Sequence, residues 1–392
     1  MAGLLLAVIY LGFISLGLPD SLNGSAWPVM HEELGVSLSS LGIVTMLISG
    51  STIISSLVSD KLTRRMGTHL VTVMSVLLTC IGIMGFSLST SFWMLCLFTV
   101  PYGFGAGAID AALNNYIALH FSSRHMNWLH CFWGVGTIIS PYIMGYCLTA
   151  SAGWRGGFRA VGFIQLALFL VIALSYPLWR NPPHLSGQEE VEPLKLTLFE
   201  KLKLPGAVFL LLSFFCYCAA EATVMNWAST YLVAAKAVEK STAAKCGSLF
   251  FIGMTVGRFL SGFVSQKLGD RRLMRVGLGV AGVGILLLFL PLPLSVTIAA
   301  LVIIGLGCAP IYPAIIHSTP ANFGAEASSG MIGLEMACAY VGSTFMPPVY
   351  GLLAEHLSPA VLPLFLTVFL GLHLLFMELL NRKKRQDAAR AS

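Results

Sequence analysis

Twelve apolar runs, each long enough to cross a lipid bilayer, constrain the fold of this chain more than any other feature. A bilayer offers the backbone no hydrogen-bond partners, so each run is expected to form a helix of about 20 residues. The composition agrees, because 56% of the 392 residues are hydrophobic and only 10% are charged. We therefore predict an all-α membrane protein with twelve transmembrane helices. The runs are centred near residues 16, 49, 78, 104, 139, 169, 219, 254, 282, 306, 340 and 371.

The distribution of lysine and arginine predicts how the chain is oriented. Of the 23 Lys and Arg residues, 17 fall in the loops and the tail on one side of the predicted helices. By the positive-inside rule that side is cytoplasmic, and it includes both termini. This distribution accounts for the net charge of +6 without a nucleic-acid partner. The expected location is the cell membrane, the inner membrane in a bacterium, with the lipid bilayer as surrounding partner.

A polar segment in the middle of the sequence divides the chain. The stretch RNPPHLSGQEEVEPLKLTLFEKLKL at 180–204 separates the first six apolar runs from the last six. We therefore predict an N-terminal six-helix bundle at 1–180, a cytoplasmic linker at 181–203, a C-terminal six-helix bundle at 204–382 and a basic cytoplasmic tail at 383–392.

The two halves share positions at nearly constant offsets of about 201 to 206 residues. Such offsets indicate a duplicated six-helix unit. Two pseudo-symmetric halves joined by a linker are typical of alternating-access carriers, whose substrate site lies near the bilayer midplane between the halves. The matching positions are Asp20 with Glu221, GFGAGAID at 103 with GLGCAPIY at 305, Asp60 with Gln266, and Gly136 with Gly342.

The loops after the second and eighth runs carry a family signature. SDKLTRRMG at 59–67 and SGFVSQKLGDRR at 261–272 resemble the loop signature of the major facilitator superfamily. The resemblance implies the major facilitator fold and secondary transport by a single chain. Four further segments resemble the fucose-permease-like branch, the fucose, galactose and glucose:proton symporters. They are GAIDAALN at 107–114, NWLHCFWGVGTIISP at 127–141, GLGCAPIYPAIIHSTP at 305–320 and IGLEMACAYVGSTFMPP at 332–348.

The sequence departs from the family pattern at a few positions. Val58 and Ser59 stand where the first loop usually has a glycine before Asp60, and Gln266 replaces the acid of the second loop. Glu335 stands where relatives more often have an amide. The first two departures bear on gating and the third on the choice of substrate.

Four acidic side chains lie inside the predicted spans: Asp20, Asp110, Glu221 and Glu335. An ionisable group at the bilayer centre costs about 2.5 to 3.5 kcal/mol, so its presence indicates a function. Each of the four is a candidate both for proton coupling and for contact with the substrate. A site lined by acids disfavours anionic substrates.

Asp110 is the leading candidate for proton coupling. Asn114 follows four residues later on the same helix face, and Gly103, Gly105 and Gly107 allow a neighbouring helix to approach closely. Burial disfavours the charged form of a carboxyl group. The resemblance adds that the fucose-permease-like branch uses an acid on the fourth helix for coupling. The alternative is that amides cap Asp110 and only fix helix packing.

Asp20, Asn23 and Trp27 follow one another at the spacing of a single helical stripe. A carboxylate and an amide can bind sugar hydroxyls while an indole covers the apolar face of the ring; the alternative is a packing role. Glu221 and Asn226 are expected to converge only if the seventh helix is broken between them. The other candidates for substrate binding are Asn114, His130, Trp133, Asn226, Trp227 and Tyr312.

Charged residues in and near the two signature loops are candidates for gating. Charge-assisted bonds from these loops can hold the cytoplasmic side closed in the outward-facing state. The alternative is that the loops serve only topology. The candidates are Asp60, Arg64, Arg65, Arg258, Asp270 and Arg271.

Together these features predict a secondary active transporter that carries a neutral polar solute with protons by alternating access, and a monosaccharide is the expected solute. Proton antiport of cationic or amphipathic compounds is the alternative. The sequence shows no nucleophile with its base, so no enzyme is expected. The nine cysteines have no disulfide or zinc spacing. No metal or cofactor is expected besides the proton, with Na⁺ as an alternative coupling ion, and the chain is expected to be monomeric.

Overall fold

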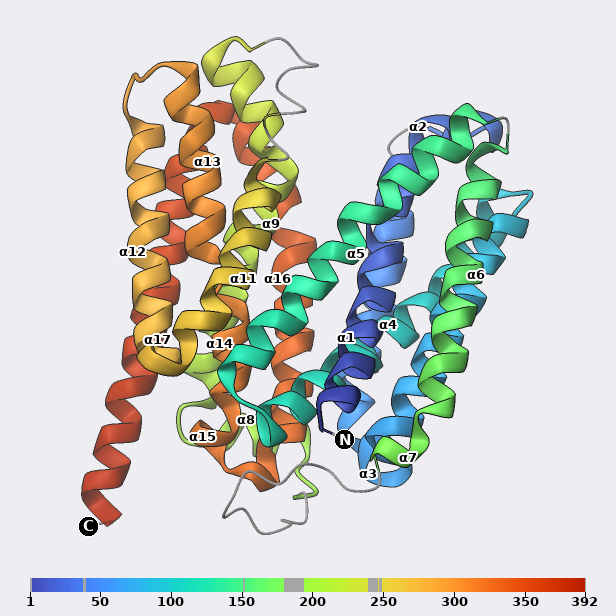
Figure 1. The fold of residues 1–392 in the computed structure, drawn as a ribbon. Helices are drawn as coiled ribbons and strands as arrows, with labels where there is room; N and C mark the ends of the chain where they lie inside the picture. Colours follow the sequence, from blue (N-terminus) through green and yellow to red (C-terminus); the bar gives the residue numbers. More distant parts are fainter. Residues whose placement is uncertain are drawn as a thin grey trace. The chain divides into compact units, whose positions relative to one another are not determined.

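The computed structural model describes residues 2–37, 40–150, 152–179, 194–238, 246 and 249–391. Nearly all of these residues are helical (Figure 1). Contacts between Cα atoms divide the chain into two compact units. Unit 1 comprises Met1–Phe121 and Leu129–Val191, and unit 2 comprises Ser122–Trp128 and Glu192–Ser392. Of the predicted linker, residues 181–193 lie outside the described part of the chain.

Unit 1 is built from long helices. Its longest, α3, has 48 residues and would extend for about 72 Å if straight, more than twice the thickness of a bilayer core. Gly67 interrupts it with a non-helical backbone, φ 76° and ψ 157°, so α3 contains two of the predicted spans. The helices are α1 (Ala2–Asp20), α2 (Leu22–Glu33), α3 (Leu41–Leu88), α4 (Phe92–His120), α5 (Ser123–Thr149), α6 (Gly153–Leu174) and α7 (Tyr176–Trp179).

Unit 2 begins with a short capped helix and continues with the second set of long helices. Thr197 and Glu200 form a capping box at the start of α8, within the predicted linker. The predicted basic tail continues α17 as helix to Ala391. The helices are α8 (Leu198–Lys203), α9 (Ala207–Lys236), α11 (Leu249–Leu268), α12 (Asp270–Phe289), α13 (Leu294–Cys308), α14 (Ile311–His317), α15 (Thr319–Phe323), α16 (Ala325–His356), the 3₁₀ turn η2 (Pro359–Val361) and α17 (Leu362–Ala391).

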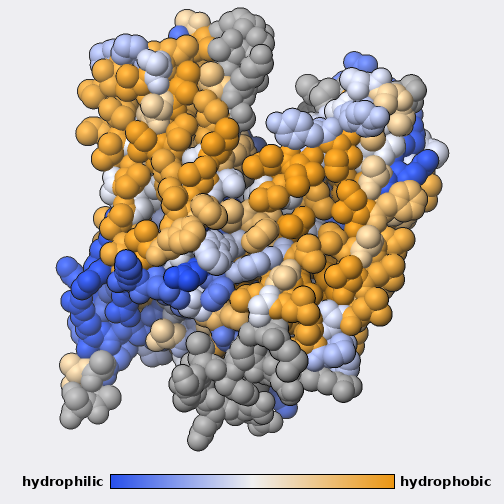
Figure 2. Space-filling model, viewed as in Figure 1, coloured by the Kyte–Doolittle hydropathy of each residue, from blue (hydrophilic) through white to orange (hydrophobic). Residues whose placement is uncertain are grey.

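The predicted fold class is confirmed. Within the described residues, ten helical segments are long and apolar enough to span a membrane, with α3 counted once. The second arm of α3 and the 32-residue α16 supply the remaining two of the twelve predicted spans. Large apolar side chains such as Phe259, Phe263 and Leu286 are at least half exposed, and broad hydrophobic bands cover both units in Figure 2. The chain is an all-α membrane protein with two six-helix units.

Glycines set the closest helix contacts of unit 1. A Cβ atom added to Gly103 or Gly107 on α4 would lie 2.5 Å from the Ile48 carbonyl oxygen or 2.4 Å from that of Thr52, both on α3. Gly105 lies against the other arm of α3. The close approach predicted for these three glycines is therefore confirmed, and it brings the α4 face that carries Asp110 into the interior of the unit.

Candidate functional site

Asp20 ends α1, just before Ser21 interrupts the helix. Its side chain is exposed. The Tyr102 hydroxyl donates to Oδ1 at 2.7 Å, and the Trp133 indole Nε1 donates to Oδ2 at 2.8 Å. Each carboxylate oxygen therefore has one neutral donor and retains a lone pair for another hydroxyl.

Close packing of α1 against α5 places Trp133 beside Asp20. A Cβ atom on Gly17 would lie 2.1 Å from the Trp133 carbonyl oxygen, and one on Gly136 would lie 2.7 Å from that of Ile14. Since any side chain at these positions would push the helices apart, the two glycines are what allow the indole to reach the carboxylate.

The other two members of the predicted α1 stripe lie away from solvent. Trp27 is only 2% exposed and belongs to the apolar core of unit 1 with Leu22 and Phe86. Asn23 is 7% exposed. Because the helix is interrupted at Ser21, spacing measured on one continuous helix does not describe this segment, and the three side chains do not share one exposed face.

Asp110, Asn114 and His130 form a buried hydrogen-bonded chain between α4 and α5. Their exposed fractions are 4%, 0% and 5%. The Asn114 amide nitrogen donates to Asp110 Oδ1 at 2.7 Å and to the Asp110 carbonyl at 2.9 Å. Asn114 Oδ1 lies 3.0 Å from His130 Nε2. Because this amide oxygen can only accept, His130 must carry its proton on Nε2 in this arrangement.

Glu221 on α9 is held by a charged partner. Arg258 on α11 lies 3.3 Å from Glu221 Oε1, and the two side chains are 4% and 11% exposed, respectively. Arg258, predicted as a gating residue, thus lies beside a predicted substrate residue. Tyr217, one turn before Glu221, donates to the Cys308 carbonyl at 2.8 Å and is within hydrogen-bonding reach of the Glu221 carboxylate.

Asn226 and Trp227 do not converge with Glu221. The helix α9 is continuous over Ala207–Lys236, so a separation of five residues places Asn226 about 140° around the axis from Glu221. Asn226 is exposed, and its amide donates to the Ala222 carbonyl at 2.7 Å. The Trp227 indole donates to the Pro347 carbonyl at 3.0 Å.

Glu335 is sealed inside unit 2 with Thr319, and both residues are 0% exposed. The Thr319 hydroxyl lies 2.9 Å from each carboxylate oxygen and 3.3 Å from the Ile315 carbonyl. A protonated Glu335 can donate to Thr319 while Thr319 donates to Ile315, which satisfies all three groups. The other predicted residue nearby, Tyr312, donates to the Met336 sulfur at 3.3 Å.

The first signature loop makes a local ion pair, and the second makes bonds to other helices. Asp60 pairs with Arg64 one turn later on α3, and Arg65 is exposed. Asp270 accepts from the Ser123 hydroxyl and contacts His317 Nδ1, each at 2.7 Å. These contacts join the start of α12 to α14 and to the first turn of α5, within unit 2.

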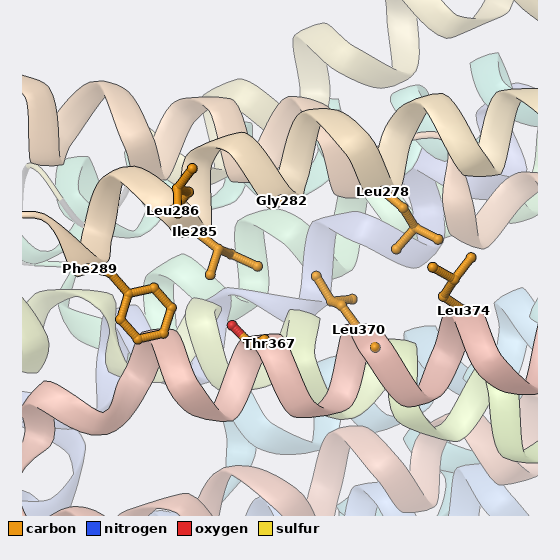
Figure 3. A pocket seen from close by; sticks show the side chains of 9 residues that line it. Leu278, Gly282, Ile285, Leu286, Phe289, Thr367, Leu370 and Leu374 are labelled. Atoms are coloured by element: carbon orange, nitrogen blue, oxygen red, sulfur yellow. The ribbon is translucent and has the colours of Figure 1, made fainter.

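An apolar groove between α12 and α17 has a volume of about 330 Å³ (Figure 3). Its one hydroxyl belongs to Thr367, which donates to the Pro363 carbonyl at 2.8 Å. The groove therefore offers a polar solute no free donor and is unsuitable as its binding site. It is lined by Leu278, Gly282, Ile285, Leu286, Phe289, Thr367, Leu370, Gly371 and Leu374.

Within the residues that the structure describes, no three His, Cys, Asp or Glu side chains lie close enough together to hold a metal ion. The cysteines are all free thiols. The polar clusters above offer carboxylates, amides, hydroxyls, indoles, an imidazole and a guanidinium group as their binding groups.

Sequence reasoning missed several partners of the predicted residues. Tyr217 precedes Glu221 by one helical turn, so its spacing was an available signal. Tyr102 and Thr319 had none, because each meets its acid from a different helix. The partner of Asp20 lies 82 residues away and that of Glu335 lies 16 residues away across a break between helices.

Comparison of the sequence with protein families matches the Major Facilitator Superfamily over residues 9–244 and 210–392. Bypass of stop codon protein 6 from Saccharomyces cerevisiae is 22% identical over 277 residues, which are 65% of this chain and 56% of the yeast protein. The match thus spans little more than half of that relative. The glucose/mannose transporter GlcP of Bacillus subtilis is 20% identical over 315 residues, 78% of this chain and 77% of GlcP.

Solved structures show the same fold. The E. coli fucose:proton symporter FucP in its outward conformation superposes with a TM-score of 0.79 at 15% identity, covering 96% of this chain and 98% of FucP. The human organic anion transporter MFSD10 gives a TM-score of 0.78 at 14% identity, covering 96% of this chain and 98% of MFSD10. The expected likeness to the fucose-permease-like branch is confirmed at the level of the fold. This chain, a transporter and not an enzyme, belongs to the Major Facilitator Superfamily.

Proposed function

We propose that the protein carries a neutral polar solute, a monosaccharide, together with protons by alternating access. The buried chain Asp110–Asn114–His130 is the observation that carries this proposal. It places a carboxyl group inside the membrane-spanning part of unit 1 and links it to α5 through one amide.

Protonation of Asp110 would change a hydrogen bond between α4 and α5. The amide of Asn114 donates to Asp110 Oδ1 and accepts from His130. A proton on Oδ1 turns that acceptor into a donor, so Asn114 must rotate its oxygen toward Asp110 and release His130. One turn beyond His130, α5 carries Trp133, which holds Asp20. Loading of the proton site is thus connected to the carboxylate that we assign to the solute.

Asp20 is the expected contact for solute hydroxyls. Its carboxylate is exposed, and each oxygen has capacity for a further donor beyond Tyr102 or Trp133. Sugar transport by FucP, GlcP and the proton:xylose symporter XylE supports a sugar as the solute. The pairing of Glu221 with Arg258 balances its charge, which disfavours proton antiport of cations.

The decisive experiment compares two kinds of transport by Asp110→Asn in proteoliposomes. Proton-driven accumulation requires net proton movement, whereas counterflow exchanges solute without it. We expect accumulation to be lost and counterflow to be retained. Asp387→Asn, which removes an acid paired with Lys383 far along α17, is the matched control and should accumulate normally. Undiminished accumulation by Asp110→Asn would refute the coupling role.

The solute is identified by thermal-shift screening of sugars, polyols, amino acids and cationic drugs at two pH values. Stabilisation by one or a few sugars supports symport, and stabilisation by cationic amphiphiles alone supports antiport instead. Repeating accumulation with an imposed Na⁺ gradient distinguishes Na⁺ from H⁺ as the coupling ion. We further propose that the chain acts as a monomer in a bacterial inner membrane with both termini in the cytoplasm, which reporter fusions at each terminus would test.

A further inference from the structure

Each unit joins its first long helix to its last long helix through a buried serine. In unit 1 the Ser15 hydroxyl on α1 donates to Gln165 Oε1 on α6, and Gln165 Nε2 donates back to the Ser15 carbonyl. The two residues are 1% and 0% exposed. Glutamine thus uses both atoms of its amide group in the pair.

Unit 2 makes the same junction with histidine in place of glutamine. Ser213 on α9 and His373 on α17 are 1% and 0% exposed. The Ser213 hydroxyl lies 2.8 Å from His373 Nδ1 and 3.2 Å from the His373 carbonyl, while Nδ1 lies 3.0 Å from the Ser213 carbonyl. The two contacts to the imidazole both involve Nδ1. Nε2 is buried with no hydrogen-bond partner among the described residues.

The second nitrogen of His373 therefore needs an explanation. Whichever tautomer is present, a polar atom is left unsatisfied in the interior of a membrane protein, which is costly. The glutamine of unit 1 shows that a side chain without this extra atom can join the helices. The junction between the two helices therefore does not require the second nitrogen of His373.

A small polar cavity adjoins Ser213. Its volume is about 10 Å³, near the minimum that one water molecule needs, and polar groups in its lining can bind that water. The amide nitrogen of Asn381 is buried in this lining and has no partner within the described residues. The polar lining residues are Ser213, Arg271, Ser318, Asn322 and Asn381.

On the other side, His373 meets the neighbours of Glu221. The ring centroids of His373 and Tyr217 are 5.8 Å apart, and Tyr217 is within hydrogen-bonding reach of Glu221. The charged and titratable groups around this region are Glu221 and Tyr217 on α9, Arg258 on α11, Arg271 on α12, Cys308 on α13 and Lys384 on α17.

We propose that His373 is a proton-binding group that exchanges protons with water in the cavity beside Ser213 and relays them inside unit 2 toward Tyr217 and Glu221. The relay part of this inference rests on the proton coupling proposed above. It gives unit 2 its own proton path, separate from the Asp110 chain of unit 1.

The proton balance of the relay is simple. In the Nε2–H tautomer, the Ser213 hydroxyl donates to Nδ1. A proton delivered by cavity water to Ser213 Oγ displaces the hydroxyl proton onto Nδ1 and forms an imidazolium. The Nε2 proton then passes to the Tyr217 hydroxyl oxygen while that hydroxyl gives its own proton to the Glu221 carboxylate. One proton thus enters and one leaves, and His373 is neutral again with its proton on Nδ1.

Proton binding can be measured without transport. The imidazole C2–H exchanges with deuterium only where water reaches the ring, and its rate follows the titration of the ring. In the purified full-length protein we expect deuterium at His373, read by mass spectrometry, to rise with pH through a single midpoint. The exposed His356 is the positive control. Absence of exchange at His373 where His356 exchanges would overturn the proposal.

The relay is tested by His373→Gln, which rebuilds the junction of unit 1. We expect this variant to fold and to perform counterflow like the wild type, while its proton-driven accumulation rate falls about 100-fold. His373→Phe, which lacks the bond to Ser213, separates loss of the junction from loss of the nitrogen. Normal accumulation by His373→Gln would reduce His373 to a packing residue and refute the relay.

The two proposals fail in distinguishable ways. If wild-type protein accumulates no solute in response to a proton gradient, the proposed symport is wrong, while deuterium exchange still decides whether His373 binds protons. If wild type accumulates solute and Asp110→Asn does not, but His373→Gln does, only the relay is wrong.

Discussion

The two units hold the acid of their first long helix in different ways. In unit 1 Asp20 is exposed and accepts from two neutral donors, Tyr102 and Trp133. In unit 2 the corresponding Glu221 is buried and paired with Arg258. Both acids stand at matching positions of the duplicated sequence, so position in the repeat does not decide the electrostatics.

The difference separates two roles for an acid inside a membrane protein. Neutral donors orient the Asp20 carboxylate and leave its charge and spare lone pairs for a solute. A buried arginine cancels the charge of Glu221 and makes the pair a structural unit whose members depend on each other. The two halves of the duplicated fold therefore differ at this position. Unit 1 has an exposed carboxylate, Asp20, that can bind a solute, and unit 2 has a buried ion pair, Glu221 with Arg258.

Breaking the buried ion pair of unit 2 should have the largest effect on stability. Arg258→Leu leaves Glu221 buried without its counter-charge, which should cost about 3 to 5 kcal/mol of unfolding free energy. The double variant Glu221→Gln/Arg258→Leu should recover most of this loss, because no isolated charge remains. Thermal unfolding in detergent measures both, and a stable single variant would show that the pair is not structural.

The helix contacts that are alike in the two units should respond alike. A Cβ atom on Gly136 would lie 2.7 Å from the Ile14 carbonyl on α1, and one on Gly342 would lie 2.7 Å from the Phe215 carbonyl on α9. Each Gly→Ala substitution should therefore destabilise by about 1 to 3 kcal/mol, because backbone cannot give way easily. Gly145→Ala on α5, where a Cβ atom meets nothing within 4 Å, is the control and should not destabilise. Unequal losses of stability for Gly136→Ala and Gly342→Ala would show that the two helix contacts are not equivalent.

Removing one hydrogen bond to the exposed Asp20 should reduce stability less. Tyr102→Phe removes one hydrogen bond from a neutral donor to an exposed, charged carboxylate, so the expected loss of stability is about 1.5 kcal/mol. Solute binding should weaken as well, because Oδ1 loses its anchor. Melting temperature and a solute titration on the same preparation measure the two effects. A loss as large as that of Arg258→Leu would contradict the distinction between the two units.

The smallest effect is expected at an exposed ion pair of unit 1. Hydrogen bonds from Arg155 and Trp154 hold the pKa of Glu33 below its usual range. A lowered folded-state pKa means that the pair stabilises the fold above the pKa of unfolded Glu33, and that this contribution is lost as the pH falls through the folded-state pKa. Because Glu33 is about half exposed, the contribution should stay below about 1 kcal/mol.

Melting curves of wild type and Glu33→Gln between neutral pH and about pH 3 test this sign. The wild type should be the more stable at neutral pH, and the difference should shrink on acidification. A difference that grows as the pH falls would mean that Glu33 is stabilised in its protonated form instead.

Several structural relations were visible in the sequence before any coordinates. The correspondence between Gly136 and Gly342 was read from a constant offset, and both glycines lie against the first long helix of their own unit. Asp110 and Asn114 were paired from helical spacing, and they are hydrogen-bonded. The first relation comes from the internal repeat and the second from spacing within one helix. Both can therefore be read from the sequence alone.

Relations between helices escaped the sequence. Trp27 lies in the core, although spacing placed it on one stripe with Asp20. Asn226 points away from Glu221, as spacing predicts for an unbroken helix. In both cases the deciding fact was the course of one helix, interrupted at Ser21 and continuous through α9. Apolar periodicity does not report such breaks, because a Pro or polar residue in a membrane span is compatible with either course.

The sequence by itself determined that this is a membrane protein with twelve spans and an internal duplication. The spans follow because, in lipid, a helix lets each segment satisfy its own backbone hydrogen bonds. Only the tertiary structure decided which donors meet Asp20 and Glu221, and that Ser213 meets His373 across 160 residues. Those contacts depend on how close and at what angle helices cross. That geometry arises from many side chains at once and is not contained in the pattern of any single segment.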